Sequence, residues 1–146
     1  MGYTFNSMLT SNLSNVTGDG TAVDLVCDEV LSNQNSIYNN TTGQMTSVGS
    51  ANYCFQGNVC LGGLTILHTS VLVELVTTAR TYNVADFQGL ALNSSVYQIN
   101  FSQVAFLSAD ETAFVRVTVG GSFKTVDILG NSTISRTSFG GILPVV

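Results

Sequence analysis

The side chains most able to do chemistry in this chain are one histidine, three cysteines and two adjacent pairs of carboxylates. A Ser–His–Asp or Cys–His catalytic site would have to use His68, because no other histidine is present. His68 lies in the apolar stretch LTILHTSVLVEL, where Ile66 and Ser70 would share its face of a strand. We therefore interpret His68 as a packed structural residue.

The carboxylate pairs do not suggest acid–base catalysis either. Asp28 and Glu29 are adjacent, and adjacent residues of a strand point to opposite faces, so they cannot easily act together. Asp110 and Glu111 lie in the segment SADE, which is typical of a solvated turn. The GDG segment at 18–20 matches no nucleotide-binding pattern, and we predict a turn there as well.

The cysteines Cys27, Cys54 and Cys60 form no CxxC pair, and one histidine cannot complete a zinc site of the usual spacings. We interpret them as small buried apolar residues and leave a Cys54–Cys60 disulfide open. The sequence therefore predicts a protein that is not an enzyme, with no catalytic residues, no metal and no cofactor.

Charge is scarce in this chain. Charged residues make up 9% of the sequence, against roughly 25% in a typical soluble protein. The net charge is −5 and the four basic residues are scattered, so we expect no nucleic-acid binding. No apolar stretch reaches the length of a membrane span, and no signal peptide is visible, so we expect no membrane partner and synthesis in a host cytoplasm. A surface so poor in charge favours either burial in an assembly or exposure to water through neutral polar groups.

The elements that must position all these residues are strands. β-branched and aromatic residues alternate with polar ones, and glycine-rich or Asn/Ser-rich turns separate the runs. No linker divides the chain, and we expect one all-β sandwich or jelly-roll domain over 1–146. The runs are YTFNSML, TAVDLVCDEVL, NYCFQGNVCL, LTILHTSVLVELVTT, SVYQINFSQVAFL, AFVRVTV and FKTVDIL.

Several of these strands are apolar on both faces. In SVYQINFSQVAFL, one face carries Tyr97, Ile99, Phe101, Ala105 and Leu107, while Val96, Val104 and Phe106 interrupt the polar face. A two-layer sandwich buries only one face of each sheet, and large exposed apolar patches are rare on monomers. The pattern therefore predicts that the chain oligomerises through the outer face of a sheet.

Four segments occur in the order typical of one family: TSNLSNVTGDGT (10–21), TTGQMTSVGSANYCF (41–55), VAFLSADETAFVRV (104–117) and SFGGILPV (138–145). The chain resembles the globular head of the q subunit of the first complement component, a family with the fold of tumour necrosis factor. The segment SNVTGDGT is similar to viral, and especially phage, versions of this domain. Met45 and Ala51 depart from the usual Phe and Gly, and no acidic loop cluster matches a calcium site.

The resemblance implies a ten-stranded jelly roll that assembles as a homotrimer. It also implies that aromatic and aliphatic residues of the inner sheet line the trimer axis. The same residues could equally fill an ordinary sandwich core. The candidates for the trimer interface are Tyr53, Phe55, Tyr97, Ile99, Phe101 and Phe139.

The function we expect is structural. The landmarks run from about residue 10 to the end, which leaves no stalk and favours a free-standing trimer that decorates, or cements, a bacteriophage capsid. It would lie on the outer surface of the virion and clamp neighbouring major capsid subunits. A receptor-binding head of a phage tail or fibre and a cellular trimeric ligand-binding module are the alternatives.

The apolar end of the chain fits this fold. In NSTISRTSFGGILPVV we predict a closing strand that pairs with the first strand, with Phe139, Ile142 and Leu143 in the core. Gly140 and Gly141 would let a neighbouring strand or subunit approach closely.

Overall fold

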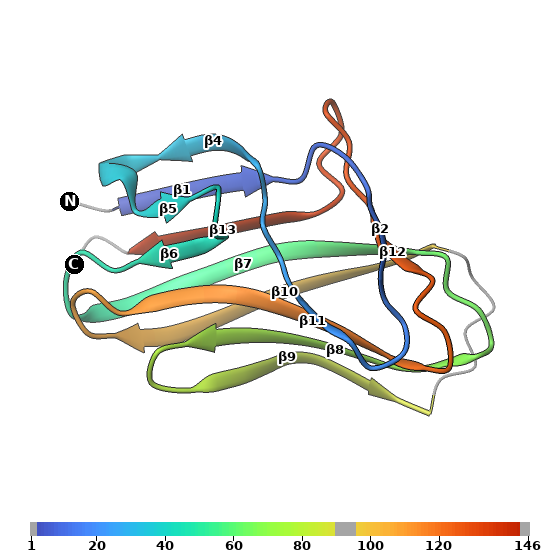
Figure 1. Cartoon of the computed structure of the whole chain (residues 1–146). Helices are drawn as coiled ribbons and strands as arrows, with labels where there is room; N and C mark the ends of the chain where they lie inside the picture. Colours follow the sequence, from blue (N-terminus) through green and yellow to red (C-terminus); the bar gives the residue numbers. More distant parts are fainter. Residues whose placement is uncertain (1–2, 90–95, 144–146) are drawn as a thin grey trace.

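The computed structural model describes residues 3–89 and 96–143 as two β-sheets packed face to face. Figure 1 shows the layers, with β7 and β13 in one sheet and β8 and β9 in the other. The described residues contain thirteen strands, more than the ten expected, because the edges of the sheets are divided into short segments. The only other element among them is the 3₁₀ turn Gln34–Ser36.

The first sheet is built on β7, which pairs with β10 on one side and with β12 and β13 on the other. All pairs are antiparallel. In the order in which they pair, its strands are β2 (Leu13–Thr17), β12 (Val126–Ile128), β7 (Ala51–Gly62), β13 (Ser138–Leu143), β1 (Tyr3–Met8) and β4 (Glu29–Asn33), with β10 (Val96–Leu107) beside β7.

The second sheet is built on β11 and β8, which pair over almost their full length. The short strands β6 and β3 follow one another along the other side of β11. In pairing order its strands are β5 (Tyr38–Asn39), β6 (Gln44–Thr46), β11 (Thr112–Gly121), β8 (His68–Thr77) and β9 (Thr81–Gln88), with β3 (Ala22–Asp24) beside β11.

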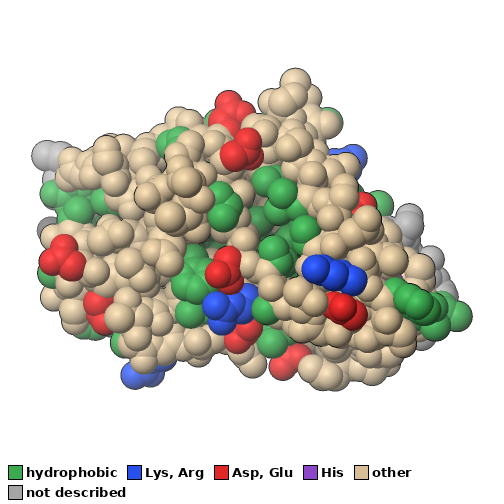
Figure 2. Space-filling view, in the orientation of Figure 1, with side chains coloured by type: hydrophobic (Ala, Val, Ile, Leu, Met, Phe, Trp, Pro, Cys, Tyr) green, Lys and Arg blue, Asp and Glu red, His purple; other side chains and the backbone are tan. Residues whose placement is uncertain are grey.

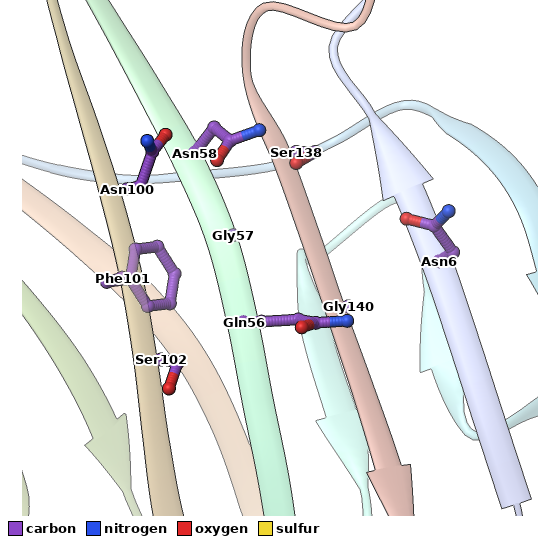
Figure 3. A pocket seen from close by; sticks show the side chains of 9 residues that line it. All are labelled: Asn6, Gln56, Gly57, Asn58, Asn100, Phe101, Ser102, Ser138 and Gly140. Atoms are coloured by element: carbon purple, nitrogen blue, oxygen red, sulfur yellow. The ribbon is translucent and has the colours of Figure 1, made fainter.

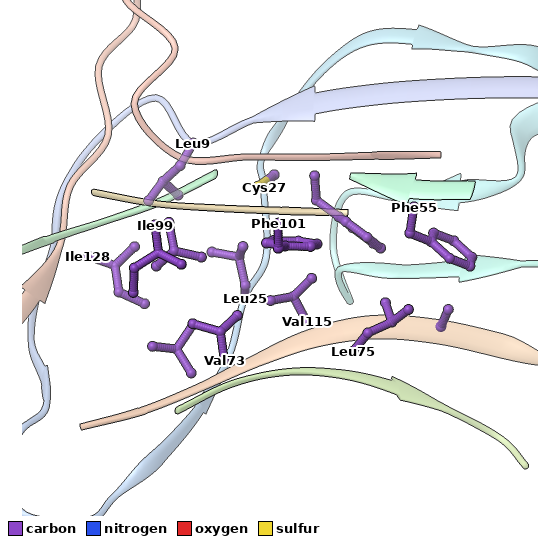
Figure 4. Packing of buried hydrophobic residues seen from close by; sticks show 14 of the residues in the cluster. Leu9, Leu25, Cys27, Phe55, Val73, Leu75, Ile99, Phe101, Val115 and Ile128 are labelled. Atoms are coloured by element: carbon purple, nitrogen blue, oxygen red, sulfur yellow. The ribbon is translucent and has the colours of Figure 1, made fainter. Parts of the chain in front are cut away.

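The core lies between the two sheets and follows the predicted alternation. In β8, Val71, Val73 and Leu75 are fully buried, while Leu72 and Val76 are half-buried on the outer face. Figure 4 shows side chains of both sheets pointing into one apolar layer. Such burial stabilises the fold by about 1.5–3 kcal/mol for each large apolar side chain.

One predicted strand proves to be two. The run TAVDLVCDEVL contains β3 in the second sheet and β4 in the first, because the chain crosses between the layers after Asp24. Leu25 and Cys27 lie in the crossing and are still buried, with the Leu25 N–H donating to the Val115 carbonyl at 2.8 Å. The alternation therefore predicted correctly that Leu25 and Cys27 are buried, but the single continuous strand that it predicted is wrong.

The closing strand is confirmed. β13 lies between β1 and β7 in the first sheet, with Tyr3 opposite Leu143 and Phe139 opposite Gly57 (Figure 1). Phe139 is buried and Leu143 is partly buried against the core. The expectation for Ile142 is wrong: it is 41% exposed, because it has the opposite parity to Phe139 along the strand.

A candidate binding face on the first sheet

The residues considered as catalytic candidates make hydrogen bonds within the fold. His68 is fully buried; its Nδ1 accepts the Thr65 N–H and its Nε2 lies 3.0 Å from the Phe123 carbonyl oxygen. The Asp28 carboxylate accepts from the Thr10 N–H and hydroxyl, and Glu111 accepts the Ser108 N–H in the predicted turn. No group of three metal-ligating side chains occurs within 3–89 and 96–143.

The three cysteines are free thiols. Cys54 and Cys60 lie on the same strand, β7, six residues apart, which is about 20 Å along an extended chain. A disulfide needs Cα atoms within about 7 Å of each other, so the structure excludes the Cys54–Cys60 disulfide that the sequence left open. Burial raises the pKa of the Cys27 thiol to about 12, which keeps it protonated and unreactive.

The six residues predicted at the trimer axis point into the sandwich. Five of them are buried within the single chain, and Tyr97 is half-buried against the Phe87 ring at 6.0 Å between centroids. This is the core position that the sequence left open, and a contact of these residues with a second subunit stays a prediction. The five buried residues are Tyr53, Phe55, Ile99, Phe101 and Phe139.

The outer face of the first sheet has an apolar half. Val104 on β10 lies opposite Cys54 on β7, which lies opposite Ile142 on β13, so these side chains form a row across three strands. Phe106 is the next outward residue of β10. Val104, Phe106 and Ile142 are 57%, 53% and 41% exposed. We call Cys54, Val104, Phe106 and Ile142 the apolar half of this face.

The other half of the same face is polar and hollowed. A cavity of about 370 Å³ lies over β10, β7, β13 and β1, as Figure 3 shows. Two rows of opposed residues line it: Ser102–Gln56–Gly140–Asn6 and Asn100–Asn58–Ser138. None of the lining residues is charged. We call this cavity the amide groove; it is lined by Asn6, Gln56, Gly57, Asn58, Asn100, Phe101, Ser102, Ser138 and Gly140.

Sequence reasoning missed the amide groove, although one signal was present. Polar residues occupy every second position of QINFS, at Gln98, Asn100 and Ser102, and two positions of QGN, at Gln56 and Asn58. The alternation places them on the outer faces of two strands. Only the register across the sheet brings those strands together at the same level.

No protein-family model matches the sequence, and no curated protein is significantly similar to it. Solved structures are similar in fold. Murine APRIL, in a crystal structure at pH 5.0, is superposed with a TM-score of 0.64 at 8% identity, covering 99% of this chain and 100% of that one. The crystal structure of murine APRIL at pH 8.5 gives a TM-score of 0.63, also at 8% identity and with the same coverage.

The globular domain of zebrafish complement 1qA gives a TM-score of 0.54 at 12% identity, covering 96% of this chain and 93% of that one. The two kinds of neighbour are the two that the sequence resemblance named. The jelly-roll fold shared by tumour necrosis factor and the complement head is therefore confirmed for this chain.

Proposed function

We propose that this chain is a non-catalytic module that assembles as a homotrimer and acts by binding. The observation that carries the proposal is the apolar half of the first sheet's outer face, where three large apolar side chains are each 41% exposed or more. Exposed apolar patches are rare on monomeric proteins and are typical of protein–protein interfaces. The strand pattern supports the choice of partner, since strands that are apolar on both faces predict that copies of the chain cover an outer face, and the family resemblance implies that the copies number three.

The surface chemistry supports an assembled protein. Figure 2 shows few blue and red side chains on the face in view, among a large area of neutral groups. With so few like charges to separate them, copies of the chain can approach closely. No helix in the described ranges is long and apolar enough to cross a membrane.

Assembly is tested by light scattering of the purified protein and of the variant Val104→Asp/Phe106→Asp. The wild-type chain should run as a trimer at micromolar concentration, and the double variant should run as a folded monomer, because each carboxylate would be desolvated at the interface. The matched control is Ile66→Asp, which changes a residue 67% exposed on the loop before β8 and should leave the trimer intact. A monomeric wild type, or a trimer that survives the double substitution, contradicts the proposal.

Within this class we propose decoration of a viral capsid as the specific role, on the outer surface of the virion. A trimer would carry a charge of 3 × (−5) = −15, which suits a surface facing away from packaged nucleic acid. It would hold neighbouring major capsid subunits by several contacts at once, so that each subunit must break several contacts to leave. Mass spectrometry of purified particles tests this: hundreds of copies in each particle are expected.

A receptor-binding head of a phage tail or fibre is the second candidate, and the amide groove favours it, because a groove of unpartnered polar groups suits a ligand. A few dozen copies at most in each particle would identify that role and contradict decoration. Absence of the chain from particles would leave the cellular ligand-binding module.

A further inference from the structure

We propose that the amide groove is a binding site for a neutral saccharide. The proposal rests on the binding role proposed above and names the class of ligand that the role would involve. It concerns the polar half of the first sheet's outer face, whereas assembly was assigned to the apolar half.

The groove has hydrogen-bonding capacity that the chain does not use. The side chains of Asn6, Gln56, Asn58, Asn100 and Ser102 make no hydrogen bond to any other residue in the described part of the chain, and Figure 3 shows them distributed around one hollow. Each amide offers a carbonyl acceptor and two N–H donors, and the serine hydroxyl both donates and accepts. Several donors and acceptors therefore converge on one volume.

The ligand that matches this set is neutral and rich in hydroxyl groups. The lining contains no Lys, Arg, Asp, Glu or His, so an ionic ligand would find no opposite charge there. A sugar hydroxyl donates and accepts, as each lining group does. The volume of about 370 Å³ lies within the roughly 300–1,000 Å³ typical of ligand sites, and it suits one or two sugar rings.

The position of the groove in the sheet argues against a peptide strand as the ligand. Its centre lies on β7 and β13, and each of these strands already pairs on both sides along the groove. Their backbone groups are therefore occupied, and strand addition needs a free edge. Recognition at this place must use side chains.

Gly140 leaves the hollow open. In the row Ser102–Gln56–Gly140–Asn6, it is the one position without a side chain. A Cβ there would lie 3.0 Å from the Phe5 carbonyl oxygen and 3.5 Å from the Asn6 amide oxygen. A side chain at this position would therefore extend into the groove.

The experiment begins with an array of neutral oligosaccharides built from glucose, galactose and N-acetylglucosamine, together with sialylated and sulfated oligosaccharides. The neutral sugar with the strongest signal is then titrated into the full chain and followed by NMR. We expect shifts of the Asn and Gln side-chain amides of the groove. The variant Gln56→Ala/Asn58→Ala should bind roughly tenfold more weakly or worse, through the loss of two hydrogen-bonding groups. The control Asn83→Ala removes an exposed amide from β9 in the other sheet and should bind as the wild type does.

Three results would overturn the inference: no neutral saccharide binds, only sialylated or sulfated sugars bind, or the double variant binds as tightly as the wild type. The first of these is also the result expected if a second copy of the chain fills the groove. Light scattering of the same samples separates this inference from the proposed assembly. A monomer that binds the sugar overturns the trimer alone, and a trimer that binds none overturns the saccharide site alone.

Discussion

Both ring nitrogens of His68 make hydrogen bonds to backbone groups of loops. Thr65 donates its N–H to Nδ1 at 3.0 Å, so the ring proton is on Nε2, which donates to the Phe123 carbonyl at 3.0 Å. Thr65 belongs to the segment before β8, and Phe123 to the segment after β11. A buried imidazole therefore joins two loops at one end of the sandwich.

The substitution His68→Phe should lower the free energy of unfolding by about 1–3 kcal/mol. It keeps a ring of similar size but removes the hydrogen bonds to the Thr65 N–H and the Phe123 carbonyl, which are both part-buried, and the loss of each such bond costs about 0.5–1.5 kcal/mol. Urea unfolding measures the change, and Asn83→Ala is the exposed control. An unchanged midpoint would show that these hydrogen bonds add nothing to stability.

Cys27 and Tyr38 form a buried polar pair. The Tyr38 hydroxyl donates to the Cys27 carbonyl at 2.9 Å and accepts the Cys27 N–H at 3.1 Å. Burial raises the pKa of Cys27 from 9.0 to about 12 and that of Tyr38 from 10.0 to about 12. Because the folded chain holds these protons more tightly than the unfolded chain, their contribution to stability is complete below pH 9 and is lost as the pH rises toward 12.

We expect the free energy of unfolding to fall above pH 9 by about 1.4 kcal/mol for each pH unit through Cys27, and more steeply above pH 10 as Tyr38 joins. Cys27→Ala should flatten the fall between pH 9 and pH 10. Tyr38→Phe should flatten only the part above pH 10. Urea midpoints measured across this range test both, and an equal slope in Cys27→Ala and the wild type would show that Cys27 is not the group responsible.

At the scale of the element, glycine allows β13 to pack between β1 and β7 against the aromatic core. Gly141 points toward the core, where a Cβ would lie 2.7 Å from Cε1 of Phe5 and 3.1 Å from Cδ1 of Phe55. The glycine therefore leaves room for two aromatic rings of the same chain. Gly140 points to the outer face, where a Cβ would come no closer than 3.0 Å to any atom.

Gly141→Ala and Gly140→Ala form a matched pair on neighbouring positions of this strand. We expect Gly141→Ala to destabilise the fold by about 1–3 kcal/mol through overpacking, and Gly140→Ala to cost less than about 1 kcal/mol. Differential scanning calorimetry would rank the two. Equal melting temperatures would mean that the rings of Phe5 and Phe55 move aside freely.

Element by element, the sequence predicted what depends on neighbouring positions. The alternation in SVYQINFSQVAFL placed Ile99, Phe101 and Leu107 inside and Val104 and Phe106 outside, as the structure has them. Alternation says nothing of which strand lies alongside, since partners are far apart in the chain. The crossing after Asp24 and the amide groove depend on such partners, and neither was predicted. The exposure of Ile142 follows from the alternation itself, and the prediction that placed it in the core overlooked its parity with Phe139.

At the scale of the whole molecule, charge contributes little to holding the fold. The described ranges contain one ion pair, Arg116 Nε to Asp24 Oδ1 at 2.9 Å, and both side chains are exposed to solvent. Pairs of this kind contribute about 0–1 kcal/mol. The stability of the sandwich must come from its apolar layer and its strand pairing.

Raising sodium chloride from about 0.1 M to about 1 M, which shortens the screening length from about 10 Å to about 3 Å, should therefore change the free energy of unfolding by less than about 1 kcal/mol. Arg116→Met, which keeps much of the side chain's length without its charge, should respond to salt as the wild type does. Urea unfolding at both salt concentrations provides the measurement. A large loss of stability in salt would indicate long-range attraction that the single pair does not supply.

The pairing of β1 with β13 also has a consequence for how the protein is made. Tyr3 is opposite Leu143, a separation of 140 positions, and β13 is the strand that joins β1 to β7. At about 5–20 residues per second, a ribosome needs roughly 7–28 s to reach the last strand after it has made the first. Until then β1 and β7 both present a bare edge, so nascent chains that lack β13 are the species most exposed to aggregation and to chaperones.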